Sequence, residues 1–259
     1  MPAAEVPTIR SKKVCRVADL GRVGYAEALL LQQRLAAARK AGAIGDVLLL
    51  CEHPHVITLG RNGKMEHLYA SEAVLHRMGV EFHHANRGGD ITYHGPGQVI
   101  GYPILQLAEI RRDVVWYVRQ LEEVMIAASA AYGIDGARIA GRTGVWVRGA
   151  RADGESAGEE KIGAIGVHIS RWVTSHGFAY NLATDLRYFD LILPCGISGG
   201  RVTSLDKLLG RTAPRMEFTT RLVAAFGEAL GLSMAGATRT ELEAMLMAAE
   251  GQPVHLAAG

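Results

Sequence analysis

The chain has 259 residues, of which 49% are hydrophobic and 21% are charged, and its formal net charge is +2. This composition is ordinary for a globular protein with one large or two small domains, and the near-neutral charge argues against a nucleic-acid-binding protein. The N-terminal segment has no secretory signal, and no apolar run approaches the roughly 20 residues that cross a bilayer, so we expect a cytoplasmic protein without membrane contact.

The N-terminal part of the sequence predicts two helices and three strands. Residues 24–41, rich in Ala, Leu, Gln and Arg, predict a helix that ends at Gly42. Ser71 is a capping residue and Gly79 a helix-ending residue, which predicts a short helix between them. Short apolar runs predict strands at 46–53, 55–60 and 80–85.

The rest of the chain predicts a sheet followed by helices. Strands are expected at 99–107, 143–147, 161–169 and 172–182. Apolar residues at steps of four and three predict a helix through Val114, Val118, Leu121, Met125 and Ala128, and further helices lie within 203–250. The polar segment 148–160 is interpreted as a mobile connection within one sheet. We therefore expect an α+β fold in a single domain over residues 1–259: a mixed, largely antiparallel sheet flanked by helices.

The stretch "RGGDITYHGPGQVIGYP" at 87–103 concentrates glycine and polar side chains. Its glycine spacing matches neither the P-loop nor the dinucleotide-binding fingerprint, so a nucleotide site has no motif support. The ten histidines include no HExxH pair, and a GxSxG nucleophile elbow is also missing, so we expect no metal and no serine hydrolase chemistry. A tight hairpin remains the simple alternative, although a hairpin alone does not require this polar cluster.

The three cysteines are odd in number and scattered, which fits a reducing compartment rather than a disulfide framework. Cys15 lies in a basic segment, and Cys51 lies in an apolar strand as a small buried hydrophobe. Cys195, in "LILPCGISGG", stands between a proline and a glycine, where it is either a buried structural residue or an exposed, rigidly aimed nucleophile.

A reactive thiol needs a neighbour that favours the thiolate. Lys161 opens the apolar, glycine-rich strand "KIGAIGVHI", and it is either a solvated strand end or an inward-pointing acid, base or charge partner. The other candidates are His94, His168 and His176.

Taken in order, "EHPHVITLGR", "RGGDITYHGPGQVIGYP", "KIGAIGVHISRWVTSHGFAYNL" and "PCGISGGRVTSL" closely resemble the lipoyl(octanoyl) transferases over roughly residues 45–210. The resemblance implies the catalytic-domain fold of the biotin and lipoate protein ligases. It also implies transfer of an octanoyl group from octanoyl-acyl carrier protein to a lysine of a lipoyl domain, in 2-oxoacid dehydrogenases or the glycine cleavage H protein. No cofactor and no nucleic acid are implied.

The resemblance also assigns roles to residues. Cys195 would hold the acyl group as a thioester, and Lys161 would favour its thiolate or shuttle protons. The segments that would bind substrate comprise Arg87, Gly88, Gly89, Asp90, Ile91, Thr92, Tyr93, His94, Ala164, Ile165, Gly166, Gly177, Phe178 and Ala179. Backbone N–H groups near Gly166 or Gly177 are candidate oxyanion donors, and Ile162, Ile165 and Val167 could line the acyl chain.

Two other functions remain open from the sequence. An ATP-dependent lipoate or biotin ligase would also use a lysine such as Lys161, but it would adenylate a free acid and would not need Cys195. A non-catalytic acyl-binding or DNA-binding regulator on the same scaffold would require neither residue.

Overall fold

The computed structural model describes residues 12–150, 156–193 and 201–251. In this part of the chain a large mixed sheet has nine strands, in the order β12-β1-β2-β6-β10-β9-β8-β7, with β11 paired to β9. The strands are β1 (Lys13–Arg22), β2 (Asp46–Glu52), β6 (Gln98–Ile104), β7 (Ala137–Ile139), β8 (Arg142–Ala150), β9 (Ser156–Ser170), β10 (Val173–Asn181), β11 (Arg201–Val202) and β12 (Leu232–Gly236).

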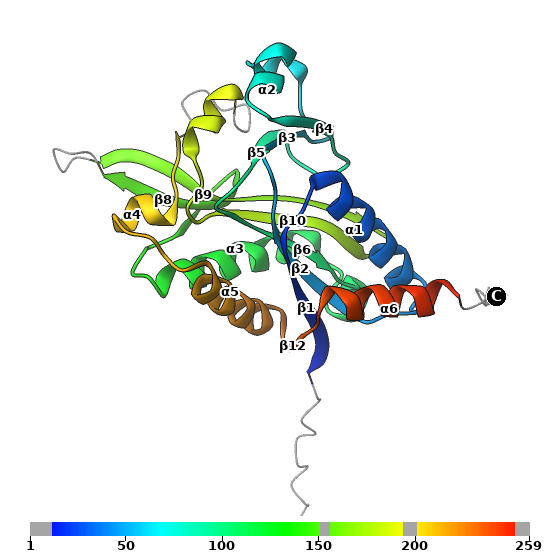
Figure 1. Cartoon of the computed structure of the whole chain (residues 1–259). Coiled ribbons are helices and arrows are strands. Elements are labelled where there is room, and N and C mark those ends of the chain that lie inside the picture. The colour runs from blue at the N-terminus through cyan, green and yellow to red at the C-terminus, as the bar shows by residue number, and fades with distance from the viewer. Residues whose placement is uncertain (1–11, 151–155, 194–200, 252–259) are drawn as a thin grey trace, which may run out of the picture.

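Helices cover both faces of the large sheet (Figure 1). Helices α3 (Val114–Ala130) and α5 (Arg215–Leu230) pack on one face, and α1 (Tyr25–Lys40) and α6 (Arg239–Glu250) pack on the other. The short α4 spans Leu205–Leu209, and a 3-10 turn, η2, spans Leu107–Glu109. Strand β2 is apolar from residue 47 to residue 51 because both of its faces are buried. Leu48 contributes to the core under α3 and α5, whereas Leu49 contributes to the core under α1 and α6.

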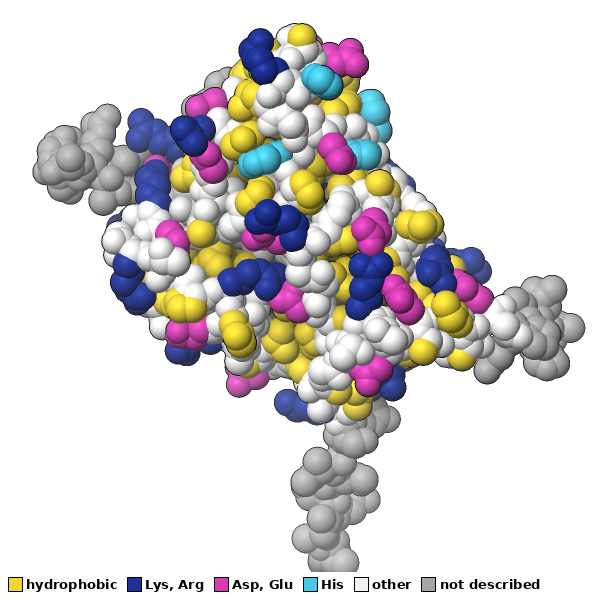
Figure 2. Space-filling view, in the orientation of Figure 1, with side chains coloured by type: hydrophobic (Ala, Val, Ile, Leu, Met, Phe, Trp, Pro, Cys, Tyr) yellow, Lys and Arg dark blue, Asp and Glu magenta, His cyan; other side chains and the backbone are white. Residues whose placement is uncertain are grey.

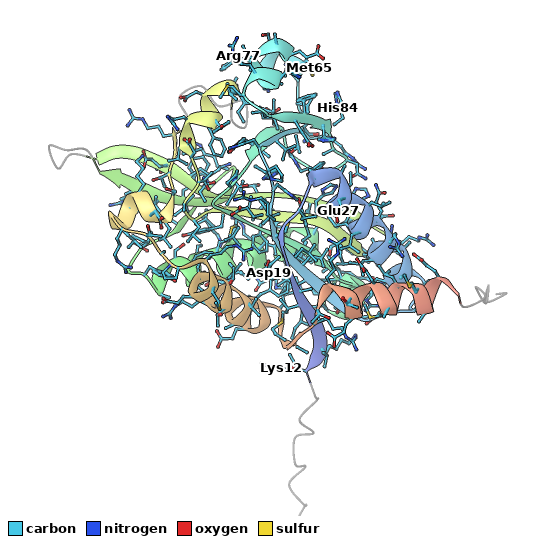
Figure 3. All side chains as sticks on the ribbon, viewed as in Figure 1. Lys12, Asp19, Glu27, Met65, Arg77 and His84 are labelled. Carbon is cyan, nitrogen blue, oxygen red and sulfur yellow. The ribbon has the colours of Figure 1, made fainter. Side chains whose placement is uncertain are left out.

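A small lobe stands on the α1 side of the large sheet and holds one wall of the site. It contains a three-stranded sheet of β3 (Val56–Leu59), β4 (Glu81–His84) and β5 (Ile91–His94), together with α2 (Glu72–Arg77) and the 3-10 turns η1 (Met65–His67) and η3 (Leu186–Leu191). Met65, Arg77 and His84 all lie on this lobe (Figure 3). Figure 2 shows acidic and basic side chains interspersed on the viewed face, without a broad basic patch.

The structure confirms the expected class of fold and most of the predicted elements. Helix 24–41 corresponds to α1, and strands 46–53 and 55–60 correspond to β2 and β3. The polar segment 148–160 does connect two strands of one sheet, but β8 and β9 extend far into it, and residues 151–155 lie outside the described part.

The sequence predictions do not include five of the described strands, namely β1, β5, β7, β11 and β12. Strand β1 lies in the basic N-terminal segment and pairs in parallel with both β2 and β12. Strand β5 lies inside the stretch 87–103, in which no strand is predicted before residue 99. No described helix is long and apolar enough to cross a membrane.

Candidate active site

A cavity of about 440 Å³ lies between the large sheet and the small lobe. Strands β9, β10 and β6 supply one wall, and the segment from Arg87 to His94 supplies the opposite wall. Some residues that line the cavity, such as Lys161 and Ala164, are half-buried, whereas others, such as Tyr25 and His176, are buried. The cavity therefore has an open end beside Lys161 and an inner end beneath the start of α1.

A β-bulge turns Lys161 toward the cavity. In the pairing of β8 with β9, Val145 faces Gly163 and Trp146 faces Lys161, so Ile162 is an extra residue on β9. Ile162 is fully buried in the core under α3, whereas Lys161 and Ala164 both line the cavity. Without the bulge, strict alternation would send Lys161 and Ala164 to opposite faces of the sheet.

Neighbours on β8 hold the Lys161 side chain. Its Nζ atom lies 4.7 Å from the centre of the buried Trp146 ring, a cation–π distance. Below it, Gly144 has a φ of 118°, and an added Cβ there would lie 2.5 Å from the Gly163 carbonyl oxygen and 3.4 Å from Lys161 Cε. The Gly144 N–H donates to the fully buried Glu122 carboxylate at 3.0 Å. This hydrogen bond holds the backbone of Gly144 close to Gly163 and to the Lys161 side chain.

Arg87 forms the roof of the cavity. Its guanidinium donates to the Thr58 side chain and to the Thr58 carbonyl oxygen, with Nη2 at 2.8 Å from each. The side chain passes directly over β9 because residue 166 is glycine: a Cβ there would lie 2.9 Å from Arg87 Cδ. A buried positive charge is thus held over the middle of the cavity.

His94 is oriented by a chain of buried amides. Asn181 donates through Nδ2 to the Thr203 carbonyl oxygen, which leaves its Oδ1 to accept from Gln98 Nε2 at 2.8 Å. Gln98 Oε1 then accepts from His94 Nδ1 at 2.7 Å, so Nε2 of His94 is the acceptor nitrogen. Burial, with a smaller effect of His53, lowers the pKa of His94 to about 3, so the ring is neutral at neutral pH.

Most of the substrate-binding residues expected from the sequence line this cavity. They are Arg87, Gly89, Asp90, Ile91, Thr92, His94, Ala164, Ile165, Gly166, Gly177, Phe178 and Ala179. Of the three candidate histidines, His94 and His176 line it and His168 does not.

Four expected residues lie elsewhere. Tyr93 points into the core of the small lobe, where its ring stacks on Tyr188, whereas its neighbours Thr92 and His94 line the cavity. The Gly88 N–H donates to the Val167 carbonyl oxygen, and neither residue lines the cavity. Ile162 is in the core under α3, so neither Ile162 nor Val167 forms the apolar wall expected of them.

Cys195 lies outside the described residues, but the described residues on either side of its segment are anchored beside the cavity. The Leu193 N–H donates to the carbonyl oxygen of the cavity residue His67 at 2.7 Å. On the other side, Val202 of β11 pairs with Lys161 of β9. Cys15 and Cys51 are free and fully buried, and burial raises the pKa of both thiols, so neither is a candidate nucleophile.

Several cavity residues were not expected from the sequence. They are Tyr25, Asn62, His67, Ile100, Tyr102, Gly141, Arg142 and Thr143. For Ile100 and Tyr102 a signal existed, because residues two apart on a strand share a face. For Tyr25 and His67 no local pattern existed, because the fold brings them in from distant segments. The described residues hold no cluster of three or more His, Cys, Asp or Glu side chains suited to a metal ion.

Comparisons with known proteins agree with this architecture. The family described as the lipoyl protein ligase A/B catalytic domain matches residues 24–227, and this chain belongs to it. Among curated relatives, an octanoyltransferase from Solibacter usitatus is 56% identical over 194 residues, covering 75% of this chain and 83% of the relative. An octanoyltransferase from Acidobacterium capsulatum is 51% identical over 227 residues, covering 84% of this chain and 91% of the relative.

A solved structure from Thermoplasma acidophilum shares the fold. It is described as a bipartite lipoate protein ligase and its E2 lipoyl domain, and it matches with a TM-score of 0.68. The match covers 92% of this chain and 91% of that chain, but only 17% of the residues are identical. This likeness extends to the fold alone.

Proposed function

We propose that this protein transfers an octanoyl group from octanoyl-acyl carrier protein, through a thioester on Cys195, to a lysine of a lipoyl domain. The protein is an octanoyl-transferring enzyme of protein lipoylation, as its relatives at 51% and 56% identity indicate. The observation that best supports the route is the cavity itself, a partly apolar chamber with Lys161 at its open end. The free thiols of Cys15 and Cys51 fit a reducing compartment such as the cytoplasm.

The first step in this proposal moves the acyl group onto the enzyme. The Cys195 thiolate attacks the thioester carbonyl of the donor, a new C–S bond forms, and the carrier's thiolate leaves. One thioester replaces another, so the free-energy change of this step is close to zero and the step needs no ATP. The anchors at Leu193 and Val202 support this role, because they hold both ends of the segment beside cavity residues.

The second step delivers the acyl group to the acceptor. The lysine amine of the lipoyl domain attacks the Cys195 thioester, the C–S bond breaks, and an amide forms. The amine loses one proton, which passes to the amine of Lys161 or to the departing thiolate. The ammonium of Lys161, held on the face of Trp146, would stabilise the Cys195 thiolate before and after transfer.

The buried part of the cavity suits the acyl tail. Ile100, Ala179 and the ring of Tyr102 give apolar surface, and each buried CH₂ contributes about 0.8 kcal/mol to binding. The Arg87 guanidinium is already engaged by Thr58, so it is fixed in place without any movement when substrate arrives.

An ATP-dependent ligase is the alternative, since lipoate ligases share the fold. The relatives of high identity favour a transferase, and the sequence has no P-loop or dinucleotide-binding signature. The deciding assay mixes the enzyme with an apo-lipoyl domain and either octanoyl-acyl carrier protein without ATP, or octanoate with ATP and Mg²⁺. We expect acceptor modification only in the first mixture. Modification only in the second would show that the protein is a ligase.

A further inference from the structure

A second cavity of about 490 Å³ adjoins the first at His176. It is formed by one side of α1 and the tip of the β9–β10 hairpin, with apolar surface from Leu29, Ala36 and Ala37. His176 is the one described residue that lines both cavities. Its imidazole Nε2 lies 2.5 Å from Oδ1 of Asn86, which lines the second cavity.

The backbone at His176 departs from normal strand geometry. On β10, Ala179 contributes to the core under α1, whereas Tyr180 stacks on Phe218 of α5, so alternation would direct His176 toward α5. His176 instead has a φ of 54°, in the left-handed region that non-glycine residues rarely adopt. The conformation brings its imidazole to the α1 side of the sheet and into the wall between the cavities.

Neighbouring groups keep His176 in this unfavourable conformation. Its backbone N–H donates to Oε1 of the buried Gln32 on α1 at 2.9 Å, and the residue is only 2% exposed. Burial and the nearby charge of Arg87 lower the pKa of His176 to about 4, so it stands in the wall as a neutral ring. A strained residue persists where its surroundings fix it, and such residues concentrate at functional sites.

We propose that His176 determines acyl-chain length by closing the inner end of the substrate cavity. This inference rests on the proposed octanoyl transfer and adds the element that limits the chain. An acyl tail that enters beside Lys161 runs toward the buried end of the cavity. There the His176 ring, held by its hydrogen bond to Asn86, blocks access to the second cavity. A chain long enough to reach this end can extend into the second cavity only if this ring moves.

The test is to replace His176 by glycine. Glycine tolerates the left-handed φ, so the variant should fold, and loss of the ring joins the two cavities. Transfer rates would be measured with octanoyl-, decanoyl- and dodecanoyl-acyl carrier protein as donors. We expect His176→Gly to raise the dodecanoyl-to-octanoyl ratio of kcat/KM at least tenfold over the unmodified enzyme. Asn86→Ala, which keeps the ring but removes its partner, should raise the ratio by a smaller factor.

Arg171→Gly is a matched control, which separates the effect of removing the His176 ring from the effect of relieving a left-handed backbone conformation. Arg171 has a φ of 50°, lines only the second cavity, and lies in the hairpin turn. Arg171→Gly should leave the ratio within twofold of the unmodified enzyme. If His176→Gly also leaves it within twofold, the inference is wrong even though octanoyl transfer proceeds. If the unmodified enzyme transfers no octanoyl group at all, it is the proposed function that fails.

Discussion

Lys161 and Trp146 are direct partners across β8 and β9, and the Lys161 Nζ atom lies 4.7 Å from the centre of the Trp146 ring. The bulge at Ile162 aims the lysine, and the aromatic face then limits where its ammonium can lie.

Replacing Trp146 by leucine should slow transfer. A cation–π contact of this kind is worth roughly 0.5–2 kcal/mol, so we expect kcat to fall about 2- to 30-fold. Trp146→Phe, which keeps an aromatic face, should lose less. Trp116→Leu is the control, because Trp116 contacts Arg111 away from the cavity. Equal losses in kcat for the two leucine variants would contradict a specific role of Trp146.

Gly144→Ala should displace Lys161. The added Cβ would meet the Gly163 carbonyl oxygen at 2.5 Å, so β8 must shift and the lysine with it. We expect kcat to fall at least tenfold, with a lower melting temperature. Gly133→Ala also adds a methyl group at positive φ, but in open space, so it should lower stability and leave kcat within twofold. Retention of normal kcat by Gly144→Ala would show that the Gly144 contact does not position Lys161.

The buried histidines should make the fold less stable in mild acid. Burial lowers the pKa of His94 to about 3 and that of His176 to about 4, whereas an unfolded histidine titrates near 6.5. Between pH 6.5 and about 4 the unfolded chain binds more protons than the folded one, so the free energy of unfolding falls as pH falls. Each histidine contributes about 1 kcal/mol per pH unit within this window.

Urea unfolding of the unmodified protein and of His176→Gly at pH 7, 6 and 5 measures this effect. The variant should show a shallower fall between pH 6 and 5, by about 1 kcal/mol per unit. Parallel curves for the two proteins would mean that His176 is protonated as easily in the folded protein as in the unfolded one.

Elements with a strong local pattern could be predicted from the sequence. The apolar run of β2 and the period of α3 each correspond to structure within a few residues. Strand β1 was missed because charged residues such as Arg16 and Asp19 interrupt its apolar pattern, and its partners β2 and β12 are distant in sequence. The local sequence does not distinguish such a strand from a loop, because the strand is defined by its pairing with β2 and β12.

The residues of the site likewise include some that the local sequence predicts and some that depend on tertiary contacts. The residues from Arg87 to His94 are predicted to bind substrate, but Tyr93 belongs to the core of the small lobe, and its neighbours Thr92 and His94 line the cavity. The bulge that aims Lys161 depends on pairing between β8 and β9, and the left-handed backbone of His176 depends on contacts with α1. Neither follows from residue type or spacing, because both arise from tertiary packing.

Intact-protein mass spectrometry reveals whether the acyl group is bound covalently to Cys195 during transfer. The enzyme would be incubated with octanoyl-acyl carrier protein, without acceptor and without ATP, and then digested to locate any adduct. We expect one octanoyl group on Cys195, removed by hydroxylamine, discharged by an apo-lipoyl domain, and missing from Cys195→Ala. An adduct that forms equally on Cys195→Ala, or octanoyl transfer at an undiminished rate by that variant, would show that the acyl group does not pass through Cys195.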